Sequence, residues 1–346
     1  MRLLSLLLLV IFFASCNNNN NNPDVSGIKL DLRIDRFEKD FFNIDTNTIQ
    51  AGLTRLNHKY PQFYPFFAND ILLMAQDHII NANGEVGLTP SGEQIIRTFF
   101  RWYHPINDSL QEKYNDLDWL QDDLENGFKY VKHYYPRYNI PGIITFIGTF
   151  DAPGTVLTPK YLGIGLHQFA GRNFSAYSDQ GITQLYPEYI SRRFDKEYIV
   201  SRCFKAVVDD IYPDTTESGK LLEIMIEKGK QWFLLEKFIP DAPDSLITGY
   251  TKAQSEWVED QEGNIWGSIL QNTPDLYTMD LERVQNYMGE SPRTMDMPDQ
   301  SPGNIGQWVG WQIVKKYAEK NPEFSIQQVL ATPANKIFQE AKYKPK

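Results

Sequence analysis

The stretch SGKLLEIMIEKGKQWFLLEKF, residues 218–238, is the strongest indication of the fold, because it is a helix-forming segment that is apolar almost all round. Its apolar positions are Leu221, Leu222, Ile224, Met225, Ile226, Trp232, Phe233 and Leu234. A helix with apolar residues on every side, rather than along one stripe, is buried in the core of a protein. We therefore predict a buried helix over these residues.

Helical periodicity recurs on both sides of this segment. Residues 116–135 form the clearest amphipathic stretch, and Pro136 ends it. Residues 304–320 form another helix, which stops at Asn321-Pro322. Further helices are expected after Asp45-Thr46, after Gly92-Glu93 and, at the C-terminus, after Thr332-Pro333.

Three segments have the pattern of β-strands. Apolar and charged residues alternate over residues 28–34, and residues 142–150 and 155–166 are rich in β-branched residues and glycine. The fold class is therefore α+β, mainly α-helical with a small β-sheet. Without an internal repeat or a second linker, residues 28–346 are predicted to form one globular domain. Its parts are a helical N-terminal part, 28–140, and a strand-plus-helix part, 141–346.

The N-terminus has the pattern of an export signal. Met1-Arg2 is followed by an apolar stretch from Leu3 to Phe13, which is too short to anchor the chain stably across a bilayer. Ala14-Ser15-Cys16 then resembles a bacterial lipobox, which implies a lipoprotein signal peptide over residues 1–15 and acylation of Cys16. The alternative is an ordinary signal peptide with a chance cysteine. Several acyl chains on one cysteine would hold the protein on a membrane.

The residues after Cys16 are typical of a tether. An asparagine run extends from Asn17 to Asn22, and residues 16–27 as a whole are of low complexity. The run is uncharged, whereas surface-exported lipoproteins of the Bacteroidetes often have acidic residues there. We therefore expect a cell-envelope protein on the periplasmic face of the outer membrane.

Composition excludes several classes of protein. Of the 346 residues, 42% are hydrophobic and 14% are aromatic, which excludes a wholly disordered chain. The mean hydropathy of -0.43 excludes a multipass membrane protein. The net charge is -10 and the basic residues do not cluster, so no nucleic-acid partner is expected. Cys203 lies among apolar residues and is expected to be buried rather than nucleophilic.

Known catalytic and metal-binding motifs are missing from the sequence. No two of the five histidines are three or four residues apart, and no CxxC, GxSxG, P-loop or GxGxxG motif occurs. The sequence therefore predicts no cofactor, no metal and no catalytic residue.

One set of charged residues remains in an apolar region. Its members are Arg192, Arg193, Arg202, Glu223 and Glu227. The two glutamates are four residues apart, so they share a face of the predicted buried helix. Like charges repel unless a cation or a shared proton lies between them. The set is either a metal or acid/base pair or a buried ion-pair network with the arginines, and we favour the network because no third ligand is nearby.

Motifs along the mature chain resemble the family of gliding-motility lipoproteins called GldB. They are RFEKDFF at 36–42, KYPQFY at 59–64, LGIGL at 162–166, YPEY at 186–189 with the following arginine pair, MIEKGK at 225–230, SPGNIG at 301–306, WVGWQIV at 308–314 and KYKP at 342–345. The resemblance implies an envelope lipoprotein of the Bacteroidetes that is needed for gliding and linked to the machinery that moves and exports adhesins.

The GldB family is also distantly similar to predicted zinc proteases, in which an HExxH helix precedes a helix that bears a glutamate. Glu227 would lie on the second helix, and residues 202–206, RCFKA, would replace the zinc-binding motif. This resemblance implies a zincin-like, degenerate metallopeptidase fold in which Arg202 faces Glu227 in place of the metal.

These observations lead to one expected function and two alternatives. We expect a non-enzymatic, lipid-anchored envelope protein that contacts the membrane through Cys16 and binds other envelope or motility proteins. The first alternative is a peptidase-like hydrolase that uses Glu227. The second is a glycan-binding lipoprotein with exposed aromatic side chains, since the chain has 21 Phe, 19 Tyr and 7 Trp residues.

Overall fold

The computed structural model describes residues 22–216 and 219–346, and its most deeply buried helix is α9 (Leu221–Phe238). The buried helix predicted from the sequence is thus confirmed. Helix α14 (Ile305–Lys320) crosses α9 where Gly229 and Gly310 lie against each other. A Cβ atom on Gly310 would lie 1.7 Å from the carbonyl oxygen of Met225, so the two helix backbones touch. Glycine, which has no Cβ atom, permits this approach.

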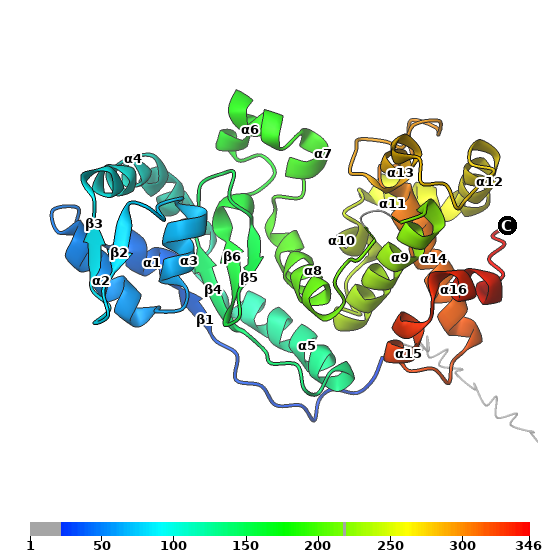
Figure 1. Cartoon of the computed structure of the whole chain (residues 1–346), viewed down its shortest axis with the longest axis horizontal. Coiled ribbons are helices and arrows are strands. Elements are labelled where there is room, and N and C mark those ends of the chain that lie inside the picture. Colours follow the sequence, from blue (N-terminus) through cyan, green and yellow to red (C-terminus); the bar gives the residue numbers. More distant parts are fainter. Residues whose placement is uncertain (1–21, 217–218) are drawn as a thin grey trace, which may run out of the picture.

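Helices α9 to α16 form what we call the helical lobe, which Figure 1 shows on one side of the molecule. Helices α14 and α16 pack on α9 and on each other. The bounds of the other helices are α10 (Asp244–Thr248), α11 (Lys252–Asp260), α12 (Glu262–Asn272), α13 (Leu281–Met288), α15 (Ile326–Ala331) and α16 (Ala334–Ala341).

The other side of the molecule is the sheet lobe, built on a four-stranded sheet in the order β1-β4-β6-β5 (Figure 1). Strands β1, β4 and β6 are parallel, and β5 is antiparallel to β6. Their bounds are β1 (Ile34–Arg36), β4 (Gly142–Phe146), β5 (Thr155–Leu157) and β6 (Tyr161–Gly165). A separate antiparallel hairpin joins β2 (His78–Ile80) and β3 (Val86–Leu88).

Helices surround this sheet, and some of them also contact α9 of the helical lobe. Helix α1 packs on β4. Helix α8 (Ile199–Ile211) lies between the lobes, because it contacts β5, β6 and α5 on one side and α9 on the other (Figure 1). The remaining helices are α1 (Phe37–Phe42), α2 (Ile49–Lys59), α3 (Tyr64–Phe66), α4 (Pro90–Lys113), α5 (Asp118–Tyr134), α6 (Gln180–Leu185) and α7 (Glu188–Ser191), with single turns η1 (Phe67–Ile71), η2 (Leu166–Gln168), η3 (Ser175–Ser178) and η4 (Lys196–Tyr198).

The class predicted from the sequence, mainly helical with a small sheet, is confirmed. The zincin-like part of that prediction stays a prediction. The strand expected over residues 28–34 is wrong except at Ile34, because β4 provides backbone partners only from that residue onward. Leu32 is nevertheless buried, so the alternating pattern reflects the packing of Leu32 against the core and not the pairing of a strand.

Two observations bear on the predicted domain bounds. β1 and β4 lie on opposite sides of the expected division at residue 140, yet they are neighbours in one sheet. Val25, within the expected tether of residues 16–27, is only 7% exposed, so the chain is already packed there. The signal peptide, Cys16 and the asparagines up to residue 21 lie outside the described residues. Among the described helices, none combines the length and hydrophobicity that a membrane span requires.

Candidate functional site

The two glutamates of the predicted charged set pair with lysines of their own helix. The Glu227 carboxylate lies 2.8 Å from the Nζ atom of Lys230, and the Glu223 carboxylate lies 3.8 Å from that of Lys220. Residues three apart in a helix share a face, so these partners are supplied locally. The predicted pairing of the glutamates with arginines is therefore wrong. The signal that could have shown this is a lysine three residues from each glutamate.

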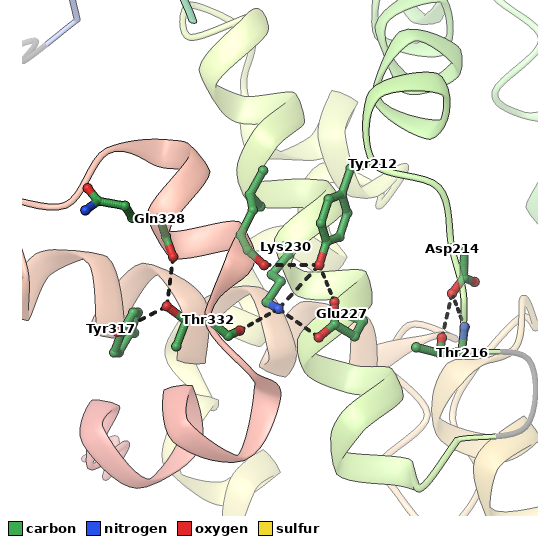
Figure 2. Close-up of polar contacts among 9 residues, drawn as sticks. Tyr212, Asp214, Thr216, Glu227, Lys230, Tyr317, Gln328 and Thr332 are labelled. Carbon is green, nitrogen blue, oxygen red and sulfur yellow. Dashed lines mark hydrogen bonds and ion pairs between the residues drawn. The ribbon is translucent and has the colours of Figure 1, made fainter. Parts of the chain in front are cut away.

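Lys230 is the centre of a polar cluster that joins α9 to the chain between α15 and α16 (Figure 2). Its side chain is 2% exposed, and its ammonium donates to Glu227, to the carbonyl of Thr332 at 2.8 Å and to the hydroxyl of Tyr212 at 3.3 Å. The Tyr212 hydroxyl donates in turn to the other Glu227 oxygen. Burial and this carboxylate raise the pKa of Tyr212 well above its usual value. All three ammonium donors are used, so this "Lys230 cluster" is saturated.

Arg193 and Arg202 lie elsewhere, at a cleft of about 430 Å³ between the two lobes, and Arg192 lies beside it in the sequence. Helix α8 provides much of its wall, including Arg202, Lys205 and Asp209. Other parts of the wall come from β5 and η2 on the sheet lobe, from α9, α10 and the start of α14 on the helical lobe, and from connecting segments that include Arg193 and Glu290. A cleft of this size between two lobes is a common place for a ligand site. We call it the interlobe cleft.

Arg202 is held in the interlobe cleft without a carboxylate partner among the described residues. Its guanidinium lies over the rings of Phe169 and Phe194, 5.6 and 5.3 Å from their centroids, which is cation–π geometry. It donates one hydrogen bond, of 3.2 Å, to the side-chain oxygen of Gln168. Burial, together with the nearby positive charge of Arg193, lowers the pKa of Arg202 to about 10, so it remains a cation at neutral pH.

The neighbouring arginines are only partly satisfied. Arg193 forms a bidentate ion pair with Glu290, in which each hydrogen bond is 3.1 Å long. Arg192 donates a hydrogen bond of 2.9 Å to the carbonyl of Gly249. The Nε atoms of both arginines are buried and have no hydrogen-bond partner in the described part of the chain. Gly249 has φ +73°, and a Cβ atom there would lie 2.8 Å from Nη1 of Arg193. Glycine at this turn therefore leaves room for the arginine.

Lys205 adds another cation to the cleft wall. It is on α8 three residues after Arg202, so both side chains lie on the same helix face. It forms no ion pair within residues 22–216 and 219–346, and it is exposed to solvent. Sequence reasoning missed Lys205, because a single lysine in an amphipathic helix has no pattern that marks it as part of a site.

The positions implied by the protease resemblance do not face each other as expected. Glu227 is bound to Lys230 and Tyr212, whereas Arg202 faces the interlobe cleft, so the predicted approach of Arg202 to Glu227 is wrong. Within the described residues, His, Cys, Asp and Glu side chains form no group of three or more that could hold a metal ion. Cys203, on the same helix, is buried as predicted, and burial raises the pKa of its thiol.

Comparison with known proteins gives one informative result. No curated protein and no solved structure matches the chain significantly. The family model described as gliding motility protein GldB, in contrast, matches residues 18–345, which is nearly the whole chain. The resemblance noted in the sequence motifs is therefore confirmed, and the chain belongs to the GldB family of gliding motility proteins.

Proposed function

We propose that this protein is a lipid-anchored component of the gliding-motility machinery, or of the secretion machinery associated with it, and that it acts by binding other envelope proteins. The observation that carries the proposal is the extent of the family match, which begins two residues after Cys16 and continues to residue 345. The family thus accounts for the whole chain that follows the candidate lipidation site. A cell-envelope location agrees with this membership.

The proposed anchor is the acylated Cys16, on the periplasmic face of the outer membrane. The first described residues, Asn22 and Pro23, line a surface groove with residues of α14 and α15. Since six residues span at most about 20 Å, an anchor at Cys16 would bring the membrane close to this part of the helical lobe. In Figure 1, helices α6 and α7 lie at the upper edge of the molecule, whereas α15 lies near its lower edge. Helices α6 and α7 would then face away from the membrane.

The test of this role is a chromosomal deletion in a gliding host. We expect the deletion to stop cell movement, the wild-type gene to restore it, and Cys16→Ala to fail because the protein is no longer acylated. Incorporation of radiolabelled palmitate would report acylation directly, and crosslinking with pull-down would identify envelope partners. Normal gliding in a clean deletion strain would contradict the proposal.

The non-enzymatic part of the proposal is supported by the environment of Glu227. Both of its carboxylate oxygens are occupied, one by Lys230 and one by Tyr212, so neither is available to a substrate. We propose that the successive helices α8 and α9 correspond to the two helices of a zincin-like fold that has lost its metal ligands. Tightly bound, one-to-one zinc in the purified protein, measured by elemental analysis, would contradict this and favour the hydrolase alternative.

The glycan-binding alternative has less support. It requires a row of exposed aromatic side chains, but the large exposed aromatics among the described residues are Trp102 and Tyr277, which belong to different lobes. Binding of oligosaccharides to the purified protein would support this alternative.

A further inference from the structure

The interlobe cleft contains more hydrogen-bond donors than the described residues satisfy. The guanidinium of Arg202 has five N–H donors and one protein acceptor, Gln168. The Nε atoms of Arg192 and Arg193 are buried without a partner. The two Nε atoms have no accessible surface, so an acceptor from outside the chain cannot reach them. Arg202 lines the cleft, and its free N–H donors are available to such an acceptor.

The charge of the cleft selects the kind of acceptor. Three cations line it, namely Arg193, Arg202 and Lys205, against two carboxylates, Asp209 and Glu290. The start of α14 also lines the cleft, and a helix N-terminus has a partial positive charge. One uncompensated positive charge therefore remains, in a protein whose net charge is -10. A monovalent anion balances this excess, whereas a doubly charged phosphate would exceed it.

Part of the cleft lining is apolar. Trp232 and Leu235 of α9 line it together with Leu246 and Ile247 of α10. An anion that enters the cleft therefore carries its charge next to a surface that suits a hydrophobic group. A carboxylate in a peptide, with an apolar side chain beside it, combines these two properties.

We infer that the interlobe cleft binds one carboxylate of a partner polypeptide together with a neighbouring apolar side chain. The carboxylate contacts Arg202 and Lys205, and the apolar side chain packs against Trp232 and Leu246. The planar guanidinium of Arg202 suits two parallel hydrogen bonds to a carboxylate. This inference rests on the proposed role in binding envelope proteins and names the chemistry by which one partner is recognised.

The test is isothermal titration calorimetry, in which defined probes are added to the full acylated protein purified in detergent. Two probes have a carboxylate: N-acetyl-Ala-Leu-Phe, with a free C-terminus, and N-acetyl-Ala-Leu-Glu-Phe-amide, with a side-chain carboxylate. The controls are N-acetyl-Ala-Leu-Phe-amide and inorganic phosphate. We expect at least one carboxylate peptide to bind and the amide control not to bind, and the peptide that binds shows which source of carboxylate is used. Binding of phosphate in preference to both peptides, or of neither peptide at millimolar concentration, would overturn the inference.

Variants of the cleft complete the test. We expect Arg202→Gln and Lys205→Gln each to weaken binding by at least about tenfold, since each removes a charged partner of the carboxylate. Arg97→Gln, which removes an exposed arginine paired with Glu93 outside the cleft, is the matched control and should bind as the wild type does. Lys205 is exposed within the cleft, so Lys205→Gln keeps the test valid should Arg202→Gln fail to fold. Unchanged affinity in both cleft variants would refute the site, whereas the gliding phenotype of the deletion strain tests the broader role independently.

Discussion

The Lys230 cluster and the interlobe cleft are both built from charged groups in the interior of the molecule, but they differ in how those groups are satisfied. Lys230 has an acceptor for each of its three donors, including a carboxylate. Arg202 has a single amide acceptor and no carboxylate among the described residues. We infer from this contrast that Lys230 is part of the structure, whereas Arg202 is available to an external anion. Four predictions test the contrast and are given in decreasing order of the expected change.

The largest effect is expected at the saturated site. Lys230→Met should lower the free energy of unfolding by about 3 kcal/mol, because it leaves the Glu227 charge and the Thr332 carbonyl without their buried donor. Urea denaturation followed by circular dichroism measures this change. The matched control is Lys228→Met on the same helix, which removes a half-buried ion pair of 2.7 Å with Asp214. It should cost about 1 kcal/mol or less, and equal losses in the two variants would show that the Lys230 cluster has no special role.

The second prediction concerns His167, which precedes a residue that lines the interlobe cleft, Gln168. His167 is fully buried; its Nδ1 atom accepts from the backbone N–H of Gly148, and its Nε2 atom donates to the carbonyl of Ala152. Burial lowers its pKa to about 4 from an ordinary value of 6.5. Between these values the unfolded chain binds a proton that the folded chain does not, so the stability of the fold falls as the pH falls. From pH 7 to pH 5 the loss should be about 2 kcal/mol.

Urea midpoints at pH 5, 6 and 7 measure this loss. His167→Asn retains an acceptor near Gly148 but has no group that titrates. From pH 7 to pH 5 the variant should therefore lose about 2 kcal/mol less stability than the wild type. Parallel pH curves for the wild type and the variant would contradict the assignment. The result bears on the interlobe cleft, because His167 precedes Gln168, which accepts a hydrogen bond from Arg202.

The third prediction concerns the turn that makes room for Arg193. Gly249→Ala should destabilise the fold by about 1–2 kcal/mol, because φ at this residue is +73° and the added Cβ atom would press on the guanidinium. The variant should also weaken binding to the cleft by displacing Arg193 from Glu290. Gly267→Ala on α12, where an added Cβ atom meets nothing within 4 Å, is the control and should be neutral or slightly stabilising. Similar melting temperatures for the two variants would be evidence against a constrained turn.

Much of the fold was predictable from the sequence. The helices over 116–135, 218–238 and 304–320 were correct to within a few residues, because their apolar periodicity and their proline or asparagine stops are local signals. Strand pairing is not local, and residues 28–33 have the alternation of a strand without a neighbouring strand to pair with. Helix α4 continues through Pro105, which local rules treat as a break.

Only the arginines of the site were predictable. The sequence marked Arg192, Arg193 and Arg202 as charges in an apolar region, and all three lie at or beside the interlobe cleft. Their partners could not be predicted, because Glu290 and Gly249 are far away in the sequence and reach the cleft through the packing of the helical lobe. The partner of Glu227, in contrast, was three residues away on the same helix.

The fourth prediction reverses the sign of the first. Arg202→Met should leave the free energy of unfolding unchanged or raise it by about 1 kcal/mol. The substitution removes a desolvated cation that has no carboxylate partner among the described residues. It also keeps an apolar side chain packed against Phe169 and Phe194. Chemical denaturation alongside Lys230→Met compares the two buried cations directly. A loss as large as that of Lys230→Met would mean that Arg202 is a structural charge, and the contrast between the two regions would disappear. A gain in stability combined with loss of peptide binding is the result expected of a residue that is retained for recognition at the expense of stability.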